Sequence, residues 1–73
     1  MVNNNSVAQL TKAARAGMGL SQRKFAVLAG VSNQAVSWWE RGIMRPTTER
    51  LQSFPEGHPL HLWAQAILRE EEK

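Results

Sequence analysis

The sequence contains no cysteine, so neither a disulfide bond nor a cysteine-based zinc site can stabilise the fold. This absence fits a reducing compartment. No apolar run approaches the roughly 20 residues that a membrane-spanning helix needs. The polar residues 1–6 lack the basic and apolar regions of a secretory signal peptide. We therefore expect a cytoplasmic protein that makes no contact with a membrane.

The sequence also lacks the residue patterns of an enzyme. Its serines fall at helix-capping positions, so a nucleophile with a base and an orienting group cannot be assembled. No glycine-rich phosphate loop follows a strand. His58 and His61 are spaced as a partial metal pair, but a third ligand of the right kind is not evident nearby. We expect no enzymatic activity, no metal, no cofactor and no small-molecule ligand.

Charge is present but unevenly distributed along the 73 residues. Residues 1–50 carry seven basic and two acidic side chains, a formal net charge of +5. Residues 51–73 carry two basic and four acidic side chains, a net charge of −2. A basic body with an acidic end is typical of a protein that binds a polyanion through its N-terminal two-thirds. The short length predicts one domain whose core is marginal without a partner.

Apolar residues at helical spacing predict an all-α fold with five helices, because no alternating pattern indicates a strand. After a flexible N-terminal arm, residues 1–5, we expect a single domain over residues 6–73. Serines at the first three helix starts are predicted N-caps. They are Ser6, Ser21 and Ser32. The predicted helices cover about 7–16, 22–29, 33–40, a short segment opening at Pro46-Thr47 that carries Leu51 and Phe54, and about 59–70.

Residues 21–41 meet the steric requirements of a helix-turn-helix, in which two short helices are joined by the turn Gly30-Val31-Ser32. The position where the helices cross must be small and is Ala26. The turn needs a positive φ and holds Gly30. No proline interrupts either helix. The positions that should be apolar are Phe25, Ala29, Val31, Val36 and Trp39. We therefore predict that Trp39 lies in the core.

These residues resemble the phage repressor and Cro family (XRE-type) of helix-turn-helix proteins. The resemblance runs from about Leu10 to Leu51 and rests on Leu20-Ser21-Gln22, Ala26, Gly30-Val31-Ser32, Val36-Ser37, Trp39-Glu40-Arg41-Gly42 and Pro46. It implies a compact, five-helix, lambda-repressor-like DNA-binding domain from a bacterium or phage. It also implies a structural ion pair between Arg15 and Glu40. Residues 55–73 lie outside the resemblance, so it implies nothing about oligomerisation.

In such proteins the second helix of the motif lies in the major groove, with its N-terminal residues at base edges. The candidates for base readout are Asn33, Gln34, Ser37 and Trp38. Asparagine and glutamine can each donate and accept a hydrogen bond at adenine. Alternatively, Asn33 or Gln34 contacts only phosphate or the local backbone. Three interpretations stay open for Trp38: contact with a thymine methyl or deoxyribose, packing on the first helix, or contact with a partner.

Six further residues are candidates for contact with the DNA backbone: Ser21, Gln22, Arg23, Ser32, Arg41 and Arg45. Gln22 resembles a family residue that binds a phosphate, at a helix N-terminus whose free N–H groups favour an anion. The alternative for each arginine is a solvated surface charge.

The last predicted helix has two interpretations. It closes the core through Leu60, Trp63 and Ile67, or it forms a homodimer interface. The candidates for that interface are Leu62, Trp63 and Ala66.

The expected function is therefore sequence-specific binding of double-stranded DNA, as a homodimer on a palindromic operator, with repression of transcription by occupying a promoter. The first alternative is an antitoxin-like module that binds a partner protein through residues 59–73 and regulates its own expression. The second alternative is an architectural DNA binder without sequence preference, which calls for a denser basic face.

Overall fold

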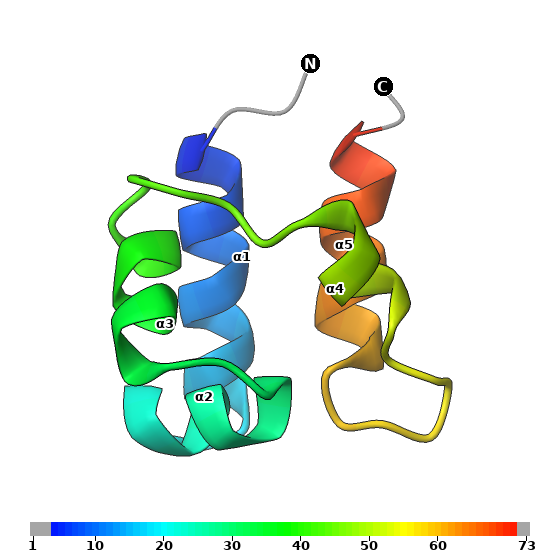
Figure 1. Ribbon diagram of the computed structural model, residues 1–73, viewed down its shortest axis with the longest axis horizontal. Coiled ribbons are helices and arrows are strands. Elements are labelled where there is room, and N and C mark those ends of the chain that lie inside the picture. The colour runs from blue at the N-terminus through cyan, green and yellow to red at the C-terminus, as the bar shows by residue number, and fades with distance from the viewer. Residues whose placement is uncertain (1–3, 72–73) are drawn as a thin grey trace.

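The computed structural model describes residues 4–71, which form five α-helices and no strand (Figure 1). The predicted all-α fold with five helices is therefore confirmed. The helices are α1 (Asn4–Gly17), α2 (Gln22–Ala29), α3 (Asn33–Glu40), α4 (Thr48–Gln52) and α5 (His61–Glu71). In Figure 1, α1 and α5 run antiparallel, with α2 and α3 on the side of α1 and α4 beside α5. None of the helices in this range is long and apolar enough to cross a bilayer.

The first helix begins earlier than predicted. Because α1 starts at Asn4, Ser6 lies inside the helix, and its prediction as an N-cap is wrong. Asn4 and Asn5, which were predicted in the flexible arm, belong to the helix, and residues 1–3 of that arm lie outside the described residues. The extra turn gives the N–H of Ala8, which is buried, a carbonyl partner four residues back.

The helices α2 and α3 begin and end at the predicted residues. The hydroxyl of Ser21 accepts a hydrogen bond from the N–H of Lys24 at 3.1 Å, and Ser32 accepts one from the N–H of Ala35 at 3.1 Å. Between the helices, Gly30 adopts a φ of 73°, in the left-handed region. A side chain there would cost roughly 1–2 kcal/mol. Gly30 thus ends α2 and Ser32 begins α3, which fixes the turn between the two helices.

The last two helices are shorter than predicted. Thr47 caps α4, and the helix ends at Gln52, so Phe54 lies beyond it. The segment before α5 folds into turns in which His58 Nδ1 accepts a hydrogen bond from the N–H of Leu60 at 3.0 Å. His61 Nδ1 donates to the carbonyl of Phe54 at 3.0 Å. Both histidines thus have a structural role in the turns before α5. Residues 4–71 contain no group of three side chains able to hold a metal.

The core surrounds Trp63 of α5. Its indole meets Phe25 edge-on at 5.1 Å between ring centroids and lies 5.6 Å from Trp39. Trp63 Nε1 donates to Thr11 Oγ1 at 3.1 Å, and Thr11 donates to the carbonyl of Val7 at 2.7 Å. Trp39 is 5% exposed, which confirms its predicted place in the core. The buried cluster comprises Val7, Phe25, Ala26, Ala29, Val36, Trp39, Leu51, Phe54, Leu60, Trp63, Ala64 and Ile67.

Candidate nucleic-acid interface

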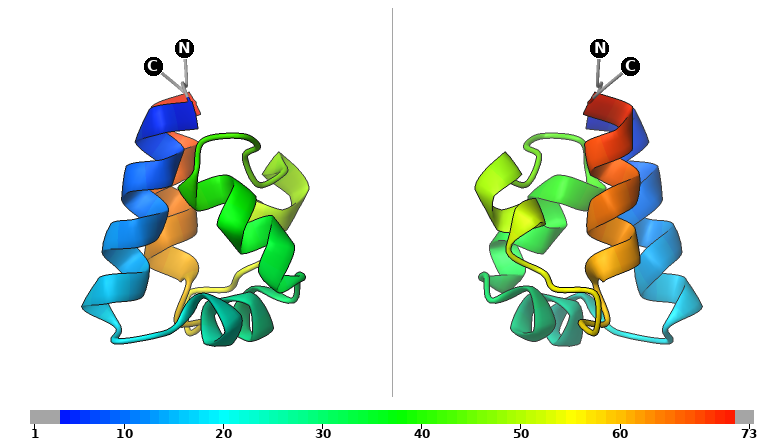
Figure 2. Two further views of the ribbon diagram at one scale, coloured as in Figure 1. Left: turned by 90° about the vertical axis from the view of Figure 1, so that its left-hand side faces the viewer. Right: turned by 90° about the vertical axis from the view of Figure 1, so that its right-hand side faces the viewer.

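The outer face of α3 carries the residues predicted to read bases. Asn33 and Gln34 are exposed at the N-terminus of the helix, and Ser37 and Trp38 are half-buried one turn later. The opposite face is buried through Val36, Trp39 and Glu40. In the left view of Figure 2, α3 crosses the face of the molecule beside α1. The helix therefore presents two free amide side chains at its leading end while its other side is anchored.

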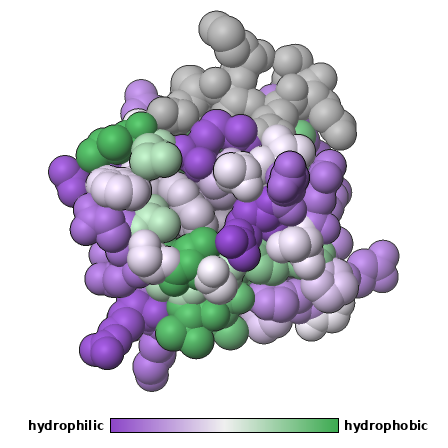
Figure 3. All heavy atoms as spheres, in the orientation of Figure 1, coloured by the Kyte–Doolittle hydropathy of each residue, from purple (hydrophilic) through white to green (hydrophobic). Residues whose placement is uncertain are grey.

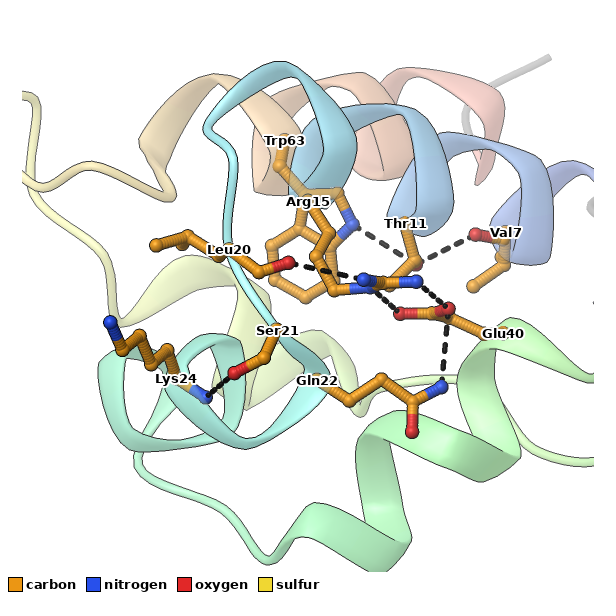
Figure 4. A network of polar contacts seen from close by, with 9 residues as sticks. All are labelled: Val7, Thr11, Arg15, Leu20, Ser21, Gln22, Lys24, Glu40 and Trp63. Atoms are coloured by element: carbon orange, nitrogen blue, oxygen red, sulfur yellow. Dashed lines mark hydrogen bonds and ion pairs between the residues drawn. The ribbon is translucent and has the colours of Figure 1, made fainter.

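An ion pair anchors the far end of α3 (Figure 4). Arg15 Nε donates to Glu40 Oε2 at 2.6 Å, and Arg15 Nη2 donates to Glu40 Oε1 at 2.9 Å. Arg15 Nη1 also donates to the carbonyl of Leu20 at 3.1 Å. Arg15 and Glu40, the two residues that the resemblance paired, thus meet in a two-point arrangement that joins α1, α3 and the loop before α2. Such forked contacts fix orientation as well as contributing energy.

The ion pair is unequally exposed to solvent. The side chain of Glu40 is 3% exposed and that of Arg15 is 27% exposed. Hydrogen bonding to Glu40 raises the pKa of Arg15 above its ordinary value, against the opposing effect of partial burial. The guanidinium therefore stays charged, and the buried carboxylate keeps its partner.

Gln22 makes a contact that the sequence did not predict. Its Nε2 donates to Glu40 Oε1 at 3.3 Å, so the amide nitrogen of this predicted phosphate contact faces into the protein (Figure 4). Gln22 and Glu40 lie 18 positions apart, and they meet only because α2 and α3 cross. The first residue of α2 thus supports the last residue of α3.

The other candidates for DNA backbone contact fall into two groups. Ser21, Arg23, Ser32 and Arg41 are exposed, and the two serines cap α2 and α3 with their hydroxyls. Arg45 is half-buried, and its Nε and Nη2 atoms are shielded from solvent. Ser32 and Arg41 thus stand at the two ends of α3, and Ser21 and Arg23 stand at the start of α2.

The segment that follows α3 shows a feature missed by the sequence reasoning. Ile43 and Met44 are 52% and 49% exposed, although both are large and apolar. The N–H of Ile43 donates to the carbonyl of Trp38 at 3.0 Å, which holds this segment against the end of α3.

On α5 the predicted interface residues separate. Leu62 is 80% exposed and Ala66 is half-buried, but Trp63 is 5% exposed. The ring of Trp63 fills the space between α1, α2 and α3, as the core-closing interpretation predicted, and leaves little surface for a dimer contact. In Figure 3, apolar side chains appear as separate groups among polar ones on the face shown.

Comparison with known proteins gives one match. A family model described as helix-turn-helix matches residues 12–56, which is more than half of the chain. The matched range contains α2, α3 and α4 together with Arg15 and Glu40. No curated protein and no solved structure matches the chain.

Proposed function

The chain belongs to the Cro/C1-type (XRE) helix-turn-helix family of DNA-binding transcription regulators, and from this premise we propose that it is a homodimeric repressor of a palindromic operator. The observation that carries the proposal is that α3 is exposed at its N-terminus and buried on its opposite face. Asn33 and Gln34 are exposed at its leading end, while Val36, Trp39 and Glu40 hold the opposite face. A helix fixed in this way can enter a major groove without rearrangement.

Base recognition falls to the exposed amides. Asn33 and Gln34 can each bond the N6 and N7 atoms of an adenine, a contact worth roughly 1–3 kcal/mol of discrimination. Ser37 and Trp38 follow one helical turn later, where Trp38 meets a thymine methyl or a deoxyribose. Because the Arg15–Glu40 pair fixes the end of α3, these side chains enter the groove in one register.

Backbone contacts position the helix on the duplex. The N-terminus of α2 offers unpaired N–H groups and a partial positive charge to a phosphate. Arg23 in the first turn of α2 and Arg41 at the end of α3 supply exposed cations. Binding therefore weakens steeply as salt rises, because phosphate contacts release counterions.

Dimerisation uses the outer side of α5. Leu62 is 80% exposed, and Ala66 lies one helical turn further along the same face. A two-fold dimer places its recognition helices about 34 Å apart, so that each reads one half-site. Repression follows from occupation of the promoter DNA.

The antitoxin-like alternative needs a C-terminal segment that is available to a partner protein. Leu60, Trp63 and Ile67 are instead buried against the rest of the chain. Leu62 and Ala66 on the outer side of α5 remain accessible, either to a second copy of the chain or to a partner protein.

Selection of bound duplexes from a random pool, followed by sequencing, tests the proposal. We expect a palindromic site, and we expect Gln34→Ala to relax the base preference at one position of each half-site. The matched control is Gln52→Ala, because Gln52 is exposed on α4, away from α3. An unchanged preference in Gln34→Ala contradicts the readout assignment, and equal binding of all duplexes favours an architectural role.

A further inference from the structure

A depression of about 470 Å³ lies between α1 and the C-terminal end of α3. It opens beside the surface assigned above to DNA, where α1 and α3 lie next to each other in the left view of Figure 2. Its lining consists of Asn5, Ala8, Gln9, Lys12, Gln22, Glu40 and Arg41. Neither the motif nor the family resemblance pointed to the residues that α1 contributes.

One face of α1 supplies the hydrogen-bond donors of this depression. Asn5, Gln9 and Lys12 are spaced by four and three residues, so they lie along one side of the helix. All three are exposed. Together they present two amides and one ammonium group over about 10 Å of helix.

The charge of the depression is positive. Glu40 is the acidic member of the lining, and its carboxylate is matched by Arg15 at 2.6 Å. Lys12 and Arg41 remain as exposed cations, and neither side chain forms an ion pair within residues 4–71. An anion that enters the depression therefore meets two cations for which no ion pair is found among the side chains that the structure describes, residues 5–70.

The depression is continuous with the proposed DNA-binding surface, because Gln22 belongs to both. Gln22 is the first residue of α2, the helix end that faces a phosphate in the proposed complex, and it also lines the depression. A strand whose phosphate sits at this end needs only to continue along α1 to reach Lys12. Because the depression adjoins the proposed DNA-binding surface, the anion that it would bind is a further phosphate of the same duplex.

We propose that this depression binds the phosphodiester backbone of the DNA beyond the helix-turn-helix. Lys12 is the charged contact and Gln9 the neutral donor that α1 adds, beside Arg41 of the motif. The proposal rests on the proposed function and extends it, since α1 becomes part of the DNA-binding surface. Each operator half-site then has at least one more protected phosphate than the motif alone provides.

The test compares Lys12→Gln with Arg69→Gln in duplex binding across a salt series. Both variants remove one positive charge from an exposed helical position, but Arg69 lies on α5 and outside the depression. A homodimer of Lys12→Gln loses one phosphate contact in each half-site, two in all. Its affinity should therefore fall roughly 12-fold less than that of the wild type between about 50 and 200 mM salt. Arg69→Gln keeps the wild-type dependence, and equal melting temperatures establish that the variants are folded.

Ethylation interference gives the second readout. In the wild type, an ethylated phosphate outside the motif contacts weakens binding, and this effect disappears in Lys12→Gln. If the wild type binds a specific duplex and Lys12→Gln retains both the salt dependence and the interference pattern, the proposed phosphate subsite is wrong. The proposed function as a DNA-binding regulator is then unaffected. If both variants change alike, net charge is responsible and the subsite is again wrong. If the wild type binds no duplex, the proposed function itself fails.

Discussion

Replacing Glu40 with alanine tests whether the ion pair fixes α3. The substitution removes an acceptor that receives two hydrogen bonds from Arg15 and one from Gln22. The carbonyl of Leu20 remains the partner of the guanidinium. The variant therefore leaves a charge that is partly buried and has lost its counterion.

The expected destabilisation follows from the exposure of the two partners. Breaking a fully buried pair costs about 3–5 kcal/mol. Because the Arg15 side chain is 27% exposed, water recovers part of this, and we expect a loss of about 2–3 kcal/mol, discounted for solvent screening. A chain of this length has a total stability of roughly 4–11 kcal/mol. The melting temperature should fall by about 10–20 °C, at about 4–8 °C per kcal/mol.

The reverse variant, Arg15→Met, should cost more than Glu40→Ala. It leaves the carboxylate unpaired, and that side chain is only 3% exposed. The double variant Arg15→Met/Glu40→Leu should lose less than the sum of the single variants, because no buried charge remains. The control is Glu56→Ala, at an exposed position after α4, which should stay within about 0.5 kcal/mol.

Urea denaturation at neutral pH measures these differences. Because the pKa of Arg15 is raised in the folded state, the stability that this pair contributes is fully present at every pH below the unfolded pKa of the guanidinium, and it is lost only as pH rises through the folded pKa. Titration of Arg15 therefore does not affect the assay. The reasoning is refuted if Glu40→Ala matches Glu56→Ala, or if the single-variant losses add without coupling.

Two further predictions concern α5. Thr11→Val should destabilise the fold by about 1–3 kcal/mol, because it leaves the Trp63 N–H without an acceptor in the core. Thr11→Ser should retain most of the stability, and equal denaturation curves for the two variants would contradict the role of the hydroxyl. Leu62→Glu should keep the monomer folded but shift the protein from dimer to monomer in sedimentation, since Leu62 is 80% exposed. A dimer that persists in this variant would place the interface elsewhere, and Glu49→Gln on α4 serves as a surface control.

The motif was predictable because its signals are local. Ser21, Gly30 and Ser32 act on backbone groups within a few residues, so the sequence alone locates both ends of α2. The start of α1 was predicted wrongly, because Ser6 has the chemistry of an N-cap but the helix begins two residues before it. Arg15 and Glu40 were paired through family resemblance, since nothing in their 25-residue separation indicates a contact.

The surroundings of α5 show the same limit. Its apolar residues cover a wide arc, and a helical period alone cannot say which of them face the core. Contacts with Thr11, Phe25 and Trp39 bury Trp63, whereas Leu62 stays 80% exposed. The depression was not predicted either. Asn5, Gln9 and Lys12 are ordinary polar residues of a helix in the sequence, and only the folded chain shows that they line one depression with Arg41.

The three tryptophans differ in their exposure to solvent, so the intrinsic fluorescence of the protein has a buried and a partly exposed component. The sequence has no tyrosine, so near-ultraviolet emission comes almost entirely from the indoles. Trp39 and Trp63 are 5% exposed, whereas Trp38 is half-buried on the outer side of α3. Emission from the first two reports whether the core is intact, and a quencher dissolved in water reaches Trp38 first. A duplex that shields Trp38 would thus be visible without attaching any dye to the protein.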